Sequence, residues 1–266
     1  MPEGPSAPRG DSPLDPHRPP HSRPTTVAER RFAERATELA GLDLAERFAR
    51  MYETNLWSDA DSRSGTGSNL GATERLRAEL PGLLRRLGVR RLVDVPCGDF
   101  HWMAHVDLTG VDYIGGDIVE ALVASNRVRH AGPGRTFLRL DLTAGPLPAA
   151  DAVLCRDCLV HLSFANIARA FRAVAASGAR YLIATTFLEQ ETNADVVDGD
   201  WRPLNLERAP FHLPPPEAVL VEGCEEEGGA YADKALAAWR VESLPGLQSE
   251  PRAHGAAPDA PQPGES

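Results

Sequence analysis

Carboxylates stand at the ends of three successive strands that the sequence predicts. Asp94 begins the stretch DVPCGDF at the end of the first strand, Asp117 ends the second in GGD, and Asp141 follows the third. Parallel strands of an open α/β sheet bring their carboxyl ends to one edge, so we expect the three side chains to share a crevice. Asp117 comes 23 residues after Asp94, near the spacing of about 20 expected for a carboxylate that binds a ribose. The alternatives are a solvated turn for Asp117 and an Asx-turn for Asp141.

A second group of titratable residues follows the fourth predicted strand, in RDCLVH. His161 lies four residues after Asp157, close behind the strand end. Both suit general acid–base catalysis, and His101 and Asp99, just after the first strand, are further candidates. The alternative for His161 is a histidine at a helix start that packing alone satisfies. The predicted catalytic residues are therefore His161, Asp157 and His101.

Alternating strands and helices must position these residues. Buried apolar runs predict strands over 91–95, 113–114, 136–142, 152–156 and 181–187. Helices over 119–130 and 163–178 separate them, and this alternation implies right-handed crossovers and a parallel sheet covered on both faces. Residues 218–221 and 236–241 are expected to pair as an antiparallel terminal edge. The predicted fold is a Rossmann-like, doubly wound α/β domain.

The chain before the sheet is predicted to be mainly helical. Thr26 and Glu29 fit a capping box, and Asp43 caps a second helix. A leucine stripe over 76–87 predicts a third helix, which Pro81 is expected to kink or split. Serine and glycine make residues 64–69 a loop.

Composition divides the chain into three parts. Residues 1–24 and 246–266 are rich in Pro, Gly and Ser and poor in large apolar residues, so we expect disordered tails. Residues 25–245 form one predicted domain. Its helical part with a lid covers 25–88, and its α/β core covers 89–245.

Charge and residue usage narrow the class of function. The formal net charge is −10 and the basic residues are scattered, which disfavours nucleic acid as a partner. There is no apolar run of membrane length and no signal-peptide pattern, so we expect a cytoplasmic protein away from membranes. Four cysteines do not suggest a disulfide framework, and a lone CxxC (155–158) predicts no metal site.

Four motifs in order resemble class I S-adenosylmethionine-dependent methyltransferases over about residues 50–245. They are LWSDADSRSGTGS (56–68), PCGDFHWM (96–103), RDCLVHLS (156–163) and NLERAPFHLPPP (205–216). The closest likeness is to a bacterial subgroup with PCGDFxWM and RDxLVHLS. The first motif departs from the usual pattern, because Pro96 and Phe100 replace two of its three glycines.

The resemblance implies S-adenosylmethionine as cofactor and a set of residues to hold it. In that set Gly98 allows close approach, Asp117 accepts from the ribose, and Asp141 accepts from the adenine amino group. The full set is Asp94, Pro96, Cys97, Gly98, Asp99, Asp117, Ile118, Asp141, Leu142 and Arg156.

The expected activity is methyl transfer, by O-methylation of a small-molecule or sugar-like acceptor. Insertions rather than the sheet should recognise the acceptor, which points to Trp201, Arg202 and Asn205, while residues 64–68 are a candidate lid. One alternative is a catalytically silent protein that binds S-adenosylmethionine or acts as a scaffold. A NAD-dependent oxidoreductase is a weaker alternative, since GxGxxG is absent. The oligomeric state does not follow from these patterns.

Overall fold

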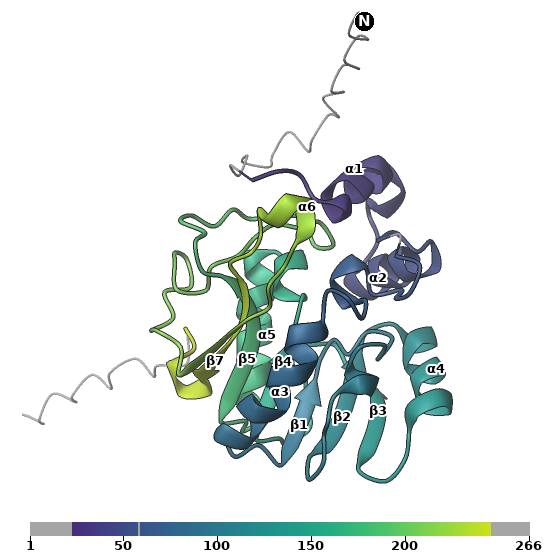
Figure 1. Cartoon of the computed structure of the whole chain (residues 1–266). Helices are drawn as coiled ribbons and strands as arrows, with labels where there is room; N and C mark the ends of the chain where they lie inside the picture. The colour runs from purple at the N-terminus through teal and green to yellow at the C-terminus, as the bar shows by residue number, and fades with distance from the viewer. Residues whose placement is uncertain (1–22, 58, 246–266) are drawn as a thin grey trace, which may run out of the picture.

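A seven-stranded mixed sheet forms the centre of the described part of the chain. The computed structural model describes residues 23–57 and 59–245 (Figure 1), so the predicted tails lie outside it except for residues 23 and 24. The strands are β1 Arg91–Asp94, β2 Asp112–Asp117, β3 Arg135–Arg139, β4 Ala152–Cys155, β5 Tyr181–Phe187, β6 Ala218–Val221 and β7 Lys234–Arg240. Their order is β3-β2-β1-β4-β5-β7-β6, and only the pairings of β7 are antiparallel among them. The predicted fold class, with its antiparallel terminal edge, is confirmed.

Helices cover both faces of this sheet. Alternate residues of each strand point to opposite sides, so both faces carry apolar side chains that the helices bury. The helices are α1 Val27–Leu39, α2 Leu44–Glu53, α3 Glu74–Arg86, α4 Glu120–His130, α5 Phe164–Ala176 and the short α6 Glu226–Gly229. In β1, Val93 belongs to the core beneath α5, whereas Leu92 belongs to the core beneath α3 and α4. In Figure 1, α3 lies in front of the sheet and α5 behind it.

The two N-terminal helices begin as predicted. The side chains of Thr26 and Asp43 each accept the backbone N–H three residues ahead, and Glu29 and Glu46 complete both capping boxes. The helices share a small core of their own, made of Phe32, Leu39, Met51 and Leu56. They lie beyond the carboxyl ends of the strands (Figure 1), where α2 and the start of α1 line the same cavity as those strand ends.

Several predicted features differ in the structure. Helix α3 continues through Pro81, so the predicted split is wrong, while no observation tests a kink there. Leu80 before the proline and Leu83 after it are both fully buried in one core, so tertiary packing holds both halves of the helix. Strand β2 is longer than predicted, and β3 ends at Arg139, before the predicted end at residue 142.

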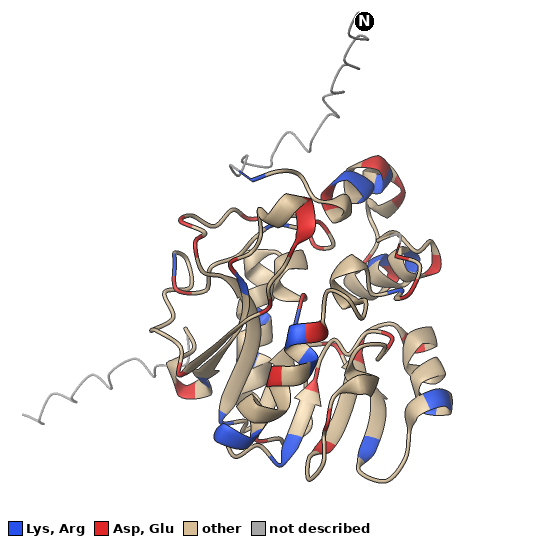
Figure 2. Ribbon diagram, viewed as in Figure 1, with Lys and Arg blue, Asp and Glu red and all other residues tan. Residues whose placement is uncertain are grey.

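The surface and the helices carry two further observations. In the view of Figure 2, Lys and Arg are spread among Asp and Glu over helices and strands. None of the described helices combines the length and the apolar character that a membrane span requires.

The buried face of α3 generates a stability prediction. Leu83→Ala should lower the free energy of unfolding by ~2–5 kcal/mol, because it removes apolar contacts and leaves a cavity in a filled core. Urea unfolding followed by circular dichroism measures the change. Val128→Ala is the control, since that side chain is 88% exposed; equal losses in the two variants would contradict the assigned core.

Candidate functional site

A cavity of about 300 Å³ opens at the carboxyl ends of the parallel strands. It lies where the strand order reverses, between β1 and β4, which is the usual ligand position in open α/β sheets. All ten residues that the sequence assigns to cofactor binding line it: Asp94, Pro96, Cys97, Gly98, Asp99, Asp117, Ile118, Asp141, Leu142 and Arg156. The structure therefore brings the predicted set together, while their roles remain predictions.

The three strand-end carboxylates are held by different partners. Asp117 accepts the backbone N–H of Gly98 at 3.2 Å with one oxygen and that of Val119 at 3.0 Å with the other. Asp94 accepts the hydroxyl of Tyr113 at 2.6 Å. Asp141 does form an Asx-turn with Thr143, and it still lines the cavity.

Burial raises the pKa of two of these carboxylates. Desolvation raises the pKa of Asp94 to about 7, against the hydrogen bond from Tyr113 and the attraction of Arg156. Desolvation also raises the pKa of Asp117 to about 6, although three backbone hydrogen bonds oppose it. Both groups are costly to ionise in the folded protein unless further donors reach them.

The turn of the first motif leaves room for a neighbouring loop. Gly98 has φ of 55°, in the left-handed region, and a Cβ there would collide with Ser64 Oγ. Phe100, which replaces a glycine of the usual motif, also has positive φ, and its ring packs against Tyr113 and Phe137 at 5.1 Å. The space beside Gly98 therefore accommodates the loop, which the sequence did not indicate.

Asp99 ties that loop to the first motif. Its carboxylate accepts Ser62 Oγ at 3.0 Å and the Arg63 amide at 2.8 Å, while the Asp99 amide donates to Ser64 Oγ at 3.0 Å. We call residues 62–68 the lid loop. It includes one short helical turn, Thr66–Ser68, inside the predicted loop.

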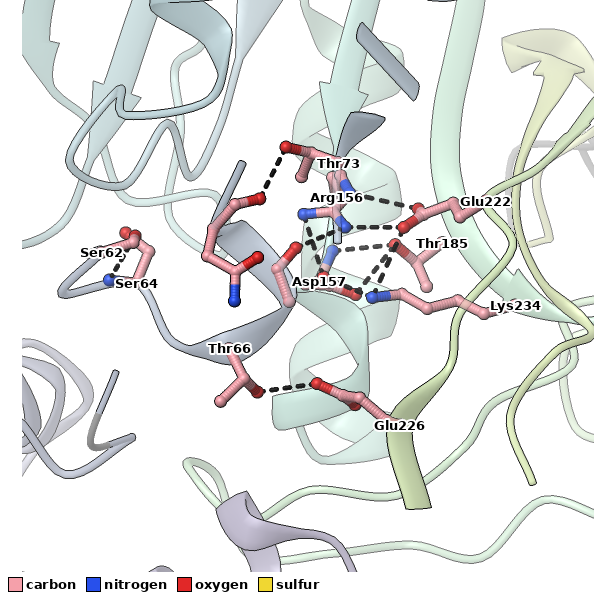
Figure 3. Close-up of polar contacts among 12 residues, drawn as sticks. Ser62, Ser64, Thr66, Thr73, Arg156, Asp157, Thr185, Glu222, Glu226 and Lys234 are labelled. Carbon is pink, nitrogen blue, oxygen red and sulfur yellow. Dashed lines mark hydrogen bonds and ion pairs between the residues drawn. The ribbon is translucent and has the colours of Figure 1, made fainter. Parts of the chain in front are cut away.

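The other end of the lid loop contacts groups across the cavity. Thr66 Oγ1 donates to Glu226 at 2.7 Å, and Arg156 donates to the carbonyl of Gly67 at 2.8 Å (Figure 3). The candidate lid is thus closed over the strand ends by side-chain contacts at both of its ends.

Arg156 belongs to a buried cluster of two cations and two carboxylates (Figure 3). It donates to both oxygens of Glu222, at 3.1 and 2.6 Å, and lies 3.2 Å from Asp157. Lys234 lies 2.7 Å from Asp157 and 3.6 Å from Glu222. The attraction of Arg156 and Lys234 outweighs desolvation and lowers the pKa of Asp157 to about 2. Asp157 is therefore held in ion pairs, and its predicted catalytic role stays a prediction.

His161 lines the cavity as a neutral imidazole. Its Nδ1 lies 2.9 Å from the carbonyl of Asp200, which can only accept, so Nδ1 carries the proton and Nε2 is left as an acceptor. Burial is the main cause that lowers its pKa to about 4. The ring faces Trp57, with centroids 5.8 Å apart.

Three other predicted residues lie outside the cavity lining, and Trp201 lies within it. His101 packs toward His105, with ring centroids 6.4 Å apart. Arg202 donates to the carbonyls of Leu159 and Leu162 at 2.7 and 2.6 Å, on either side of His161. Asn205 bonds to loop backbone, including the carbonyl of Gln190 at 3.0 Å. Arg202 and Asn205 thus brace loops, and their predicted contact with an acceptor has no support from their position.

Several residues that line the cavity were not predicted from the sequence. Lys234 and Glu226 approach the cavity from the C-terminal edge, and Phe48 and Tyr52 approach it from α2. Trp57 lies in the motif LWSDADSRSGTGS (56–68), and that motif is the sequence feature that could have indicated it. Within the described ranges, no three His, Cys, Asp or Glu side chains are placed to hold a metal ion.

Comparisons with known proteins give matches to parts of solved structures. A scan against protein-family models and a search of curated proteins find no match. The methyltransferase domain of bacterial CtHen1 is 13% identical over 44% of this chain and 66% of that one, with a TM-score of 0.38. An S-adenosylmethionine-dependent methyltransferase from Mesorhizobium loti is 27% identical over 41% and 52%, with a TM-score of 0.34. The glycopeptide N-methyltransferase MtfA complexed with sinefungin is 15% identical over 43% and 55%, with a TM-score of 0.37. The matched part spans about half to two thirds of these chains.

The contacts of Asp99 predict how the lid loop opens. Asp99→Ala should speed tryptic cleavage after Arg63 by about tenfold or more, since losing hydrogen bonds to a carboxylate raises the population of the open loop. Gel analysis of a digestion time course measures the rate. Asp61→Ala is the control, because Asp61 is an exposed carboxylate two residues before Arg63. An unchanged cleavage rate in Asp99→Ala would contradict the conclusion that Asp99 holds the lid loop against the first motif.

The raised pKa of Asp94 predicts a pH-dependent stability. Asp94→Asn should be more stable than the native protein at pH 8, by roughly 4 kcal/mol if the whole shift acts on folding. Because the folded pKa is raised, the native protein loses stability as pH rises from about 4 to about 7, and the Asn side chain removes that loss. Thermal midpoints from pH 5 to pH 8 test this. A difference that does not grow between pH 5 and pH 7 would refute it.

Proposed function

We propose that this chain is an S-adenosylmethionine-dependent methyltransferase that acts on a hydroxyl of a small molecule. The observation that carries the proposal is the meeting of Asp94, Asp117 and Asp141 in one cavity at the switch point of a doubly wound sheet. Such carboxylates suit the hydroxyl and amino donors of a nucleoside. In keeping with this, we propose a cytoplasmic enzyme without a nucleic-acid partner.

The donor and acceptor chemistry of the lining fits this cofactor. Both oxygens of Asp117 accept backbone N–H groups, and as a carboxylate with about four acceptor positions it can still accept from a ribose hydroxyl. Seven carboxylates and three cationic side chains line the cavity in the described part of the chain. An excess of negative charge favours a cationic sulfonium compound.

The same charge balance weighs against a nicotinamide dinucleotide. Its pyrophosphate would enter a predominantly acidic lining, and the turn after β1 lacks the GxGxxG pattern that cradles a pyrophosphate. The alternative of a catalytically silent binding or scaffold protein predicts that no methyl group is transferred.

The chain's own residues have separate tasks in this proposal. When bound, S-adenosylmethionine supplies an electrophilic methyl group. The protein aligns the acceptor with it, and such positioning is worth up to ~7–11 kcal/mol. His161 accepts the proton of the acceptor at Nε2, which adds roughly 10²–10⁴-fold. Arg202 positions His161 through the carbonyls of Leu159 and Leu162, and the closed lid loop keeps water from the strand ends.

Isothermal calorimetry of the full chain tests the cofactor. We expect S-adenosylmethionine and S-adenosylhomocysteine to bind and NAD not to bind. Asp117→Asn should weaken both affinities by about tenfold or more, because charge-assisted hydrogen bonds to the ribose contribute ~1.5–3 kcal/mol.

The matched control is Asp112→Asn at the opposite end of the same strand, where the carboxylate pairs with Arg91 outside the cavity. It should bind both compounds as the native protein does. Unchanged affinity in folded Asp117→Asn would remove the ribose assignment. Binding of NAD alone would replace the proposal with an oxidoreductase.

A further inference from the structure

An apolar stripe on α2 forms one wall of the cavity, away from the acidic strand ends. Leu44, Phe48 and Tyr52 are spaced four residues apart, so they lie on one side of the helix, and all three line the cavity. Each is only partly buried, so the free protein leaves part of this apolar surface open. Such a surface favours a ligand that is itself apolar.

Aromatic groups form a further part of the lining. The ring of Trp57 lies against His161 at 59°, and a Cβ on Gly65 would come within 3.0 Å of the Trp57 Cβ. The lid loop therefore packs closely on the base of the Trp57 side chain. Trp201 extends this wall and meets Tyr231 edge to face at 5.2 Å. Walls of this kind suit a flat ring that stacks or packs edge to face.

Two of the three cations that line the cavity are paired with protein carboxylates, and the third, Arg63, lies over the ring of Tyr52. Lys234 pairs with Asp157, and Arg156 pairs with Glu222, so neither charge awaits an anionic ligand. Glu226 adds a carboxylate to the lining. A carboxylate or phosphate on the acceptor would meet net negative charge here.

A sugar is also a poor fit to this part of the cavity. Its several hydroxyls would lose water against Leu44, Phe48 and Trp57, and each unpaired hydroxyl costs ~1–3 kcal/mol by mutational measures. By contrast, His161 Nε2 offers one acceptor, which matches a ligand with one hydroxyl.

We propose that the methyl acceptor is an uncharged aromatic alcohol, held against the α2 stripe and Trp57 with its hydroxyl at Nε2 of His161. The inference rests on the proposed methyltransferase activity, and it favours a phenol-like acceptor over a sugar-like one. In the reaction the acceptor oxygen bonds to the methyl carbon while the carbon–sulfur bond breaks, leaving its electron pair on sulfur. The hydroxyl proton passes to His161 Nε2 and then to water.

Calorimetry with three probes tests the class of acceptor. The full chain, saturated with S-adenosylhomocysteine, is titrated at pH 7 with 2-naphthol, 2-naphthoate and methyl β-glucoside. We expect 2-naphthol to bind about tenfold or more tightly than 2-naphthoate, because the anion meets the acidic lining, and we expect no heat from the glucoside. The same titrations without S-adenosylhomocysteine separate acceptor binding from cofactor binding.

Two phenylalanine variants locate the binding. Phe48→Ala should weaken 2-naphthol binding by about tenfold, since it removes a ring from the wall, and should leave the affinity for S-adenosylhomocysteine unchanged. Phe211→Ala is the control, because Phe211 packs on Phe164 and Phe171 outside the cavity lining. It should bind 2-naphthol normally.

The outcomes separate this inference from the proposed function. If S-adenosylhomocysteine binds but 2-naphthol does not, or if 2-naphthoate or the glucoside binds more tightly, the acceptor class is overturned and the cofactor assignment stands. Equal loss in the two phenylalanine variants also overturns it. If 2-naphthol binds as expected and S-adenosylhomocysteine does not, the proposed function fails while the aromatic pocket is supported.

Discussion

The buried cluster of Arg156, Asp157, Glu222 and Lys234 is the constraint on which the site depends. These side chains come from the ends of β4 and β6 and the start of β7, so the cluster joins the parallel part of the sheet to its antiparallel edge. Through the carbonyl of Gly67 it also reaches the lid loop. Burying charges costs free energy that only complete pairing offsets, so each member requires the others in place. The strand ends, the edge and the lid loop are thereby set relative to one another.

Two kinds of carboxylate meet in the cavity, and their environments separate their roles. Asp157 is ionised and neutralised within the protein, which lowers its pKa. Asp94 and Asp117 are buried without a cation in direct hydrogen-bond contact, so desolvation raises their pKa values. Hydrogen-bond donors of a ligand at Asp94 and Asp117 would offset the free-energy cost of burying these carboxylates. Asp157 thus stabilises the fold, whereas Asp94 and Asp117 are suited to bind a ligand.

The sequence predicted those features that depend on neighbouring residues. The apolar runs that became β1 and β5, the capping box at Thr26, the helix cap at Asp43 and the acidic strand ends were all readable from short windows. Contacts between distant segments were not. Glu222 meets Arg156 across 66 positions and Lys234 meets Asp157 across 77, and no local pattern marks such pairs. Arg202 is a related case, because a conspicuous polar side chain in a long loop was assigned to a ligand although it binds backbone carbonyls. Pro81 shows packing overriding a local preference.

The small separate core shared by α1 and α2 has an evolutionary consequence. Phe32, Leu39, Met51 and Leu56 hold these helices together, whereas Leu44, Phe48 and Tyr52 face the cavity. The apolar wall of the cavity thus comes mainly from a helix outside the sheet, while the acidic strand ends belong to the sheet itself. Substitutions at the open part of the stripe alter the shape of that wall, whereas the parts of Leu44 and Phe48 that pack on the main core are constrained. Such a division allows related chains to diversify in what they recognise while keeping one ancestral scaffold.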